Sequence, residues 1–225
     1  VELDTKEPQR FFAFLQRAFP GIPLIEVLAP RAERLAPLLL SGEVEAVDGA
    51  PGKKPTLLVR LDGTADGTKI DLNSAVENGI YAAAESGRFG LDLRLENDQP
   101  TVLLGQLGIA SVDLAPPSPL EVELSLSAAE TGPAVASATM RAPGSEVSID
   151  GSVEVAPGGV TGADFAVYVN SEDVGPWLRS LAIDLGQSFD EVPVDVNGGV
   201  VFRDGAWRIS GLNGTIAGTD VVADL

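Results

Sequence analysis

The sequence predicts a mostly β protein, in which consecutive strands pair in one long antiparallel sheet made of about three repeats. Each repeat is expected to contain several strands and one short amphipathic helix. Two observations lead to this prediction: apolar and polar residues alternate in many short segments, and one sequence motif recurs at a nearly constant spacing. The 25 glycines and 16 prolines of the 225-residue chain supply turns between these segments.

Strands are predicted where apolar residues occupy every second position, because successive side chains of a strand point to opposite faces of its sheet. The clearest segments are Leu57 to Leu61, Leu91 to Leu95, Leu120 to Leu126, Phe165 to Val169 and Val192 to Val196. Mostly charged or polar residues fill the intervening positions. One face of the sheet is therefore expected to be apolar and the other to face water.

Three stretches have helical spacing instead: residues 7–19, 99–107 and 172–181. Pro8, Pro100 and Pro176 fall in their first turns, where the missing N–H of proline costs least. Each stretch is predicted to form a short plug helix with one apolar side. The side chains expected on these apolar sides are Phe11, Phe12, Leu15, Leu103, Leu107, Trp177, Leu178 and Leu181.

A sequence motif centred on a Gly-Thr or Gly-Ser pair occurs three times, at Gly67, Gly144 and Gly218, with offsets of 77 and 74 residues. Other landmarks keep one order: strand, short helix, strand, turn, strand, Gly-Thr turn, strand. The predicted units are residues 1–85, 86–159 and 160–225, and the first carries an extra apolar insert at residues 20–37. Because no long linker separates the units, one continuous β-structure is expected.

The composition argues against several classes of function. With 33 acidic and 15 basic residues the net charge is −18, which repels phosphate backbones and anionic head groups and so disfavours both nucleic acid binding and peripheral membrane binding. The chain has no Cys and no His, so thiol nucleophiles, imidazole bases and the usual zinc sites are absent. We therefore expect no enzyme, no catalytic residues, no metal and no cofactor.

The chain begins Val1-Glu2-Leu3-Asp4, without a Met, a basic segment or an apolar segment. Its last residues stop within an alternating pattern. From these two features the sequence is expected to be a piece of a longer protein.

The third unit has the most distinctive motifs: a strand ending in Ser171-Glu172-Asp173, a helix with Trp177-Leu178, a strand led by Pro193, and Leu212-Asn213-Gly214-Thr215-Ile216-Ala217-Gly218-Thr219. This order resembles the AsmA-like repeat of bacterial envelope proteins, which include TamB-like relatives. The second unit departs from the pattern, because Pro143 and Ser145 replace the usual residues.

The resemblance implies a sheet curled into an open hydrophobic groove, in a periplasmic protein tethered to the inner membrane outside this segment. It also implies a non-enzymatic role in phospholipid transport between the inner and outer membranes. The expected partners are a phospholipid or another acyl-chain lipid, and other envelope proteins. The candidates for the groove lining are Leu57, Val59, Leu61, Leu91, Leu93, Leu95, Val122, Leu124, Val147, Ile149, Phe165, Val167, Val194 and Val196.

Two alternative functions remain open at this point. A structural or assembly module could support outer-membrane biogenesis by docking partner strands on its sheet edges. An acidic hydrolase could use Asp190 and Glu191, with Asp184 nearby, as a carboxylate pair. A solvated loop is the simpler interpretation of these three acids, because no cluster of aromatic residues surrounds them to stack sugars.

Two further features have plain structural interpretations. Asp62, Thr64, Asp66 and Asp71 have a spacing reminiscent of a calcium loop, but the other two copies lack these acids, which favours an ordinary hairpin. Trp177 is expected to pack its helix on the sheet, and Trp207 to make a core contact of a strand, with lipid contact as the alternative for either.

Overall fold

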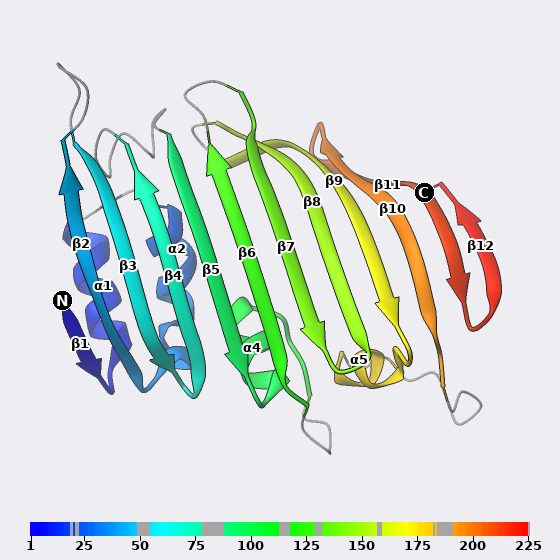
Figure 1. Cartoon of the computed structure of the whole chain (residues 1–225), viewed down its shortest axis with the longest axis horizontal. Coiled ribbons are helices and arrows are strands. Elements are labelled where there is room, and N and C mark those ends of the chain that lie inside the picture. The colour runs from blue at the N-terminus through cyan, green and yellow to red at the C-terminus, as the bar shows by residue number, and fades with distance from the viewer. Residues whose placement is uncertain are drawn as a thin grey trace.

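Twelve strands form one antiparallel sheet, and their order in space is their order along the chain (Figure 1). The computed structural model describes residues 1–18, 20, 23–48, 55–77, 88–112, 118–128, 132–156, 159–181, 183 and 191–224. The strands are β1 (Glu2–Thr5), β2 (Leu38–Val47), β3 (Thr56–Ala65), β4 (Thr68–Val76), β5 (Phe89–Asn97), β6 (Leu120–Ala128), β7 (Ala134–Ala142), β8 (Ser145–Ala156), β9 (Gly159–Ser171), β10 (Val194–Arg203), β11 (Ala206–Ile216) and β12 (Thr219–Ala223). The predicted mostly β fold with one long antiparallel sheet is confirmed.

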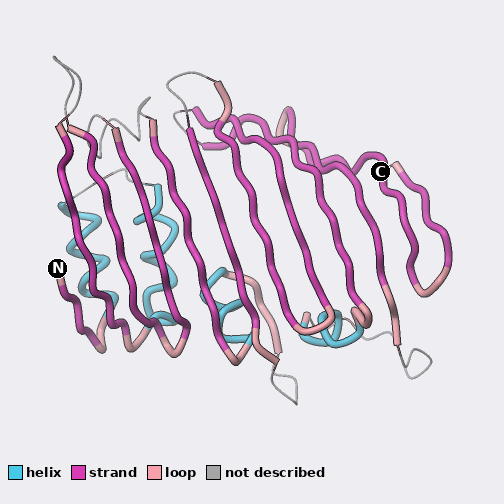
Figure 2. Tube along the Cα trace, viewed as in Figure 1, coloured by secondary structure: helices cyan, strands magenta, loops and turns pink. Residues whose placement is uncertain are grey.

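The first and last strands are not paired with each other, so the sheet is open rather than closed into a barrel. The helical elements are α1 (Pro8–Ala18), α2 (Pro23–Leu28), the 3-10 helix η1 (Ala29–Leu35), α4 (Pro100–Leu107) and α5 (Gly175–Ser180). They lie on one side of the sheet, where α1 and α2 are behind β2 to β4 and α4 and α5 are near one end of the strands (Figure 2).

The helix predictions need correction at their ends. Helix α4 begins at Pro100, one residue after the predicted start, whereas α5 is shorter than the predicted stretch 172–181 at both ends. Before α5, the Asp173 side chain accepts hydrogen bonds from the N–H groups of Gly175 (2.9 Å) and Val192 (3.1 Å), which holds this segment outside the helix. The second bond engages the Val192 N–H before β10 begins. Strand β10 therefore begins at Val194 and not at Val192.

Helices and tight turns alternate at one end of the sheet. The connections β1–β2, β5–β6 and β9–β10 contain the helices, and β3–β4, β7–β8 and β11–β12 are joined by short turns. Each of the three predicted units thus holds four strands, with its helix after the first strand. The predicted insert in the first unit contains α2 and η1, which gives this unit a larger helical cover than the others.

The β3–β4 turn illustrates why the Gly-Thr motif recurs. Asp66 and Gly67 both have positive φ angles, of 46° and 78°, which is the conformation of a type I′ hairpin turn. Ala217 and Gly218 repeat this conformation in the β11–β12 turn, with φ angles of 50° and 73°. Glycine is needed at the second position because other residues rarely adopt such angles.

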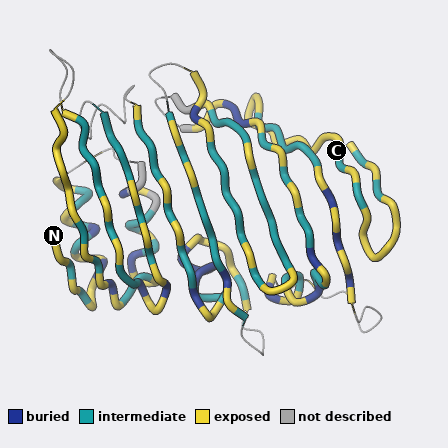
Figure 3. Tube along the Cα trace, in the orientation of Figure 1, coloured by how far each residue is buried: buried dark blue, intermediate teal, exposed yellow. Residues whose placement is uncertain are grey.

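Buried side chains form three clusters where the helices or their flanking loops meet the sheet (Figure 3). Leu38 and Ala65 pack with Phe12 of α1 in the first cluster, and Leu120 packs with Leu103 and Leu104 of α4 in the second. The third contains Val192, Val194 and Val196. Trp177 of α5 packs against the second cluster, so the helices of the second and third units share one core. No helix among the described residues is long and apolar enough to span a membrane.

Candidate functional site: the apolar face of the sheet

Strand register divides the sheet into two chemically distinct faces. Residues directly opposite each other on paired strands point to the same face, and the row Leu72, Leu93, Leu124, Ala138, Ile149 and Val167 runs across β4 to β9 in this way. We call the face that contains this row the apolar face, and the opposite one the polar face. Every charged residue within the described strands lies on the polar face.

All fourteen groove candidates lie on the apolar face. The sequence alone did not establish this, because alternation within one strand does not say how it aligns with the next. None of the fourteen is exposed: Val194 and Val196 are buried and the others are half-buried. The register therefore joins them into one continuous apolar surface over β3 to β10.

The helices cover this surface only in part. Leu38 is 2% exposed beneath α1 and η1, and Leu120 is 0% exposed beneath α4. Farther along the strands, side chains such as Leu91, Leu126 and Phe165 are only half-buried. Large side chains on neighbouring strands shield one another from water even where no second layer covers them. This mutual shielding accounts for the intermediate burial.

The total surface of the chain fits a sheet with an incompletely covered face. The chain exposes 13799 Å² at a mass of 23.3 kDa. A compact monomer of that mass is expected to expose about 9,700 Å². The difference is in the direction expected when one layer of the usual two- or three-layer arrangement is missing over much of a sheet.

The plug-helix candidates differ in burial. Phe12 and Leu103 are buried, and Phe11, Leu15, Trp177 and Leu178 are half-buried. Leu107 at the end of α4 is 40% exposed, and Leu181, which follows α5, is 43% exposed. The predicted apolar sides therefore face the sheet along most of each helix but not at the C-terminal ends of α4 and α5.

Strand β7 has the smallest side chains on the apolar face: Ala134, Ala136, Ala138 and Ala142, with Met140 between them. The neighbours paired with Ala138 are Leu124 on β6 and Ile149 on β8. Adjacent strands lie about 4.8 Å apart. A line of alanines between two lines of larger residues therefore makes the surface lowest along β7.

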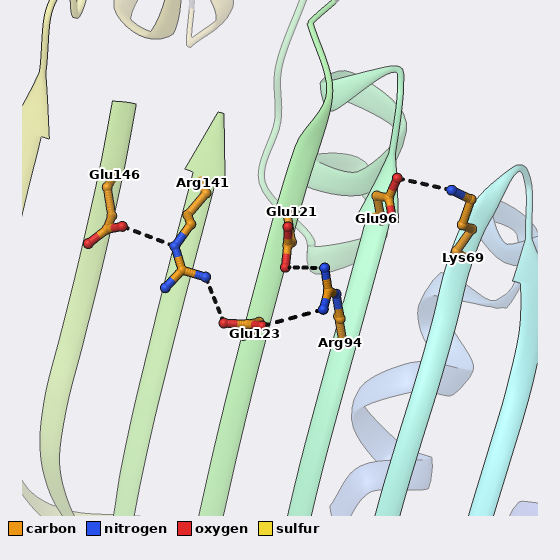
Figure 4. A network of polar contacts seen from close by, with 7 residues as sticks. All are labelled: Lys69, Arg94, Glu96, Glu121, Glu123, Arg141 and Glu146. Atoms are coloured by element: carbon orange, nitrogen blue, oxygen red, sulfur yellow. Dashed lines mark hydrogen bonds and ion pairs between the residues drawn. The ribbon is translucent and has the colours of Figure 1, made fainter. Parts of the chain in front are cut away.

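The polar face carries a ladder of ion pairs across β4 to β8 (Figure 4). Lys69 pairs with Glu96 at 3.0 Å, and Arg94 bridges to Glu121 at 2.8 Å and Glu123 at 3.9 Å. Arg141 then joins Glu123 at 2.7 Å to Glu146 at 3.0 Å. All of these groups are at least partly exposed, so the ladder contributes more to strand register than to overall stability.

Arg141 has an electrostatic effect on its neighbours in this ladder. The hydrogen bond that it donates to Glu123 holds the pKa of that carboxyl below its ordinary value. The bonds to Glu123 and Glu146 raise the pKa of Arg141 itself. Both groups are thus held in their charged forms on the solvent side of the sheet.

Two shallow hollows lie on the polar face. One of about 450 Å³ is bordered by Asp150, Asp164, Tyr168 and Asn197, and one of about 380 Å³ by Asp92, Arg94 and Glu123. Their polar rims make them unsuited to acyl chains. The described residues contain no group of three or more acids that could hold a metal ion.

The other sequence candidates are placed as follows. Asp62 and Asp71 face each other on paired strands of the polar face, and Asp66 lies in the turn beyond them. Asp184 and Asp190 lie outside the described residues, and Glu191 is exposed. Trp207 is 62% exposed, so its predicted core contact is wrong. Among the described residues, no helix packs over its part of β11.

A buried polar network that the sequence did not predict fixes α4 to the first unit. Thr68 donates a hydrogen bond to the Gln106 side-chain oxygen at 2.7 Å, and Asn97 donates to the Thr68 hydroxyl at 2.7 Å. The Gln106 amide nitrogen donates to the carbonyl oxygens of Ala65 at 2.9 Å and Arg34 at 3.1 Å. The recurring Gly-Thr pair gave the only signal for it, because Thr68 follows the turn glycine.

Comparison with known proteins adds no assignment: no family model matches the chain, and no curated protein or solved structure is similar to it at a significant level. The candidate site therefore depends on geometry and chemistry alone. Its distinguishing property is a wide apolar surface without a single charged strand residue, covered by helices over only part of its area.

Proposed function

We propose that this chain is a non-enzymatic segment of an AsmA-like periplasmic protein, and that its apolar face holds acyl chains of phospholipids in transit between the two membranes. One observation carries the proposal: all charged strand residues lie on the polar face, while the fourteen groove candidates form one continuous surface on the other. Each unit has four strands with a helix after the first strand, and this order supports the resemblance to the AsmA-like pattern.

The energetics suit a long and weakly selective binding surface. Each methylene group removed from water contributes about 0.8 kcal/mol of stabilisation. A half-covered apolar face of a monomer is itself unfavourable in water, so a lipid tail and the protein surface both gain from contact. An acyl chain lying along the row of alanines on β7 would contact larger side chains on both sides, such as Leu124 and Ile149.

This arrangement requires no chemical step. Lipid tails would slide along side chains of similar hydrophobicity, while head groups remain in water beyond the strand ends. An open sheet suits such a role because a closed barrel would have to open to admit a branched molecule.

A second candidate function is supported by the two edges of the sheet. Strand β1 covers only residues 38–41 of β2, and β12 covers only residues 212–216 of β11. Among the described residues, the outer edges of β1, β12 and the remaining parts of β2 and β11 pair with no other strand. These edges could accept strands of partner proteins, as expected of an assembly module in outer-membrane biogenesis.

Lipid extraction and native mass spectrometry of the purified chain separate the two functions. We expect co-purified phospholipid, and we expect Ala138→Asp to lower the amount at least about fivefold, because it places a charge at the centre of the apolar face. Thr139→Asp is the matched control on the polar face and is expected to keep the lipid. A folded wild-type sample that repeatedly carries no lipid would overturn the proposal and leave the assembly module.

A further inference from the structure

The β10–β11 hairpin ends in a tip with a distinctive arrangement of side chains. Asp204 and Gly205 form its turn, with positive φ angles of 55° and 74°. Phe202 and Trp207 are directly opposite each other on the two strands, with ring centroids 4.9 Å apart. Both belong to the apolar face, at the end of the sheet away from α4 and α5 (Figure 1).

This aromatic pair is poorly covered. Trp207 is 62% exposed and Ile209, two residues along the same strand, is 40% exposed. Exposing a large aromatic side chain is costly in water unless the site meets a partner of suitable polarity. The indole ring combines an apolar body with an N–H donor, which is why tryptophan favours the boundary between the head groups and acyl chains of a membrane.

The charges at the tip complement a phospholipid surface. Arg203 and Arg208 lie on the polar face of the same hairpin, and both are exposed. Neither forms an ion pair with a described residue. Asp204 is the one acid between Phe202 and Arg208, so these tip residues carry a net positive charge in a chain whose net charge is −18. Guanidinium groups bind phosphate through paired hydrogen bonds.

We propose that the tip of the β10–β11 hairpin, formed by Phe202, Arg203, Trp207 and Arg208, contacts the surface of a phospholipid bilayer. Trp207 enters the boundary region, and the two arginines bind lipid phosphates. This inference rests on the proposed function, and it adds the place where a lipid passes between the bilayer and the apolar face. The route follows β10, where Val196, Gly198, Val200 and Phe202 succeed one another on the apolar face.

The test uses neutral phosphatidylcholine vesicles, because the net charge of −18 would oppose binding to anionic ones. In a Trp177→Phe variant, Trp207 is the only tryptophan of the chain. Its fluorescence is expected to shift to shorter wavelength on adding vesicles, and brominated acyl chains are expected to quench it. In flotation assays, Trp207→Ser should weaken vesicle binding by roughly tenfold.

Matched variants distinguish vesicle binding through the tip from nonspecific vesicle binding through other exposed residues. Phe14→Ser removes an aromatic residue of similar exposure, 61%, on α1, and Arg60→Gln removes an exposed arginine from the polar face of β3. Neither is expected to change binding, whereas Arg203→Gln with Arg208→Gln should weaken it. An unchanged emission spectrum, or equal loss in the Phe14→Ser control, would overturn the inference.

A second copy of the chain is the competing occupant of the tip. If Trp207→Ser changed only the sedimentation of the protein and not its vesicle binding, the tip would be a self-association surface and the inference would be wrong. Lipid co-purification is measured separately, through Ala138→Asp. Retained lipid with no vesicle contact refutes the tip alone, and absent lipid refutes the proposed function.

Discussion

Gly63 in β3 lies against the backbone carbonyl of Leu39 in β2: a β-carbon added to this glycine would come within 2.0 Å of the carbonyl oxygen. Gly214 in β11 stands in the same relationship to Asp195 in β10, also at 2.0 Å. Both glycines lie three residues before a turn residue with positive φ, Asp66 and Ala217. The first and third units therefore have the same close approach of two strands at the same point.

Gly63→Ala is expected to destabilise the protein by about 2–4 kcal/mol, because the new methyl group must displace the β2 backbone. Urea unfolding measures this change. Gly90→Ala in β5 is the matched control, since nothing lies within 4 Å of its added β-carbon, and it should change stability by less than about 1 kcal/mol. Equal effects of the two substitutions would contradict the close packing of β2 and β3.

Gln106→Leu is expected to destabilise the protein by about 2–3 kcal/mol, because it leaves the Thr68 hydroxyl and the Ala65 carbonyl without this partner in a buried site. Leu107→Gln, at an exposed position of the same helix, should have little effect. Adding Thr68→Val to Gln106→Leu should recover part of the loss, and strictly additive losses in this double-mutant cycle would argue against a shared network.

The link between Glu123 and Arg141 predicts a dependence of stability on pH. Because the pKa of Glu123 is lower in the folded protein, its contribution is present above the pKa of the unfolded carboxyl and is lost as pH falls through the folded value. The stability difference between wild type and Glu123→Gln should therefore shrink on acidification. Thermal unfolding across the acidic range measures it.

Two comparisons test the origin of this pH dependence. In an Arg141→Gln background, the acid-dependent part of the Glu123→Gln effect should largely disappear, because the hydrogen bond that lowers the pKa is gone. High salt should weaken the effect in the wild-type background, since both groups are exposed. A stability difference that stays constant with pH would rule out this role for the ion pair.

The sequence was sufficient to predict the sheet because its signal is local. Alternation at Leu91, Leu93 and Leu95 marks a half-buried strand whatever lies beside it, and helical spacing around Trp177 marks an amphipathic turn. The common face of the candidates was not predictable, because it depends on register between strands. Register depends on turn lengths and bulges, such as the shift between Asn197 and Gly199 in β10.

Contacts between segments that are distant in the sequence could not be predicted for a similar reason. Gln106 reaches Thr68 from 38 residues away, and no local pattern distinguishes it from a surface glutamine. Tryptophan usually packs in a core, yet the position of Trp207 on β11, near an uncovered part of the sheet, leaves it exposed. The exposure of a residue on a sheet depends on the next layer, which alternation does not describe.

Site-specific photocrosslinking in cells tests whether the apolar face of the sheet holds phospholipid. A photoreactive residue at Leu124 would face the apolar side of β6, and the same residue at Ser125 would face the polar side one position later. Mass spectrometry of the purified protein then reads out any phospholipid adduct. We expect an adduct at position 124 and little or none at position 125. Equal yields at both positions, or none at either in a folded protein, would contradict lipid binding on the apolar face.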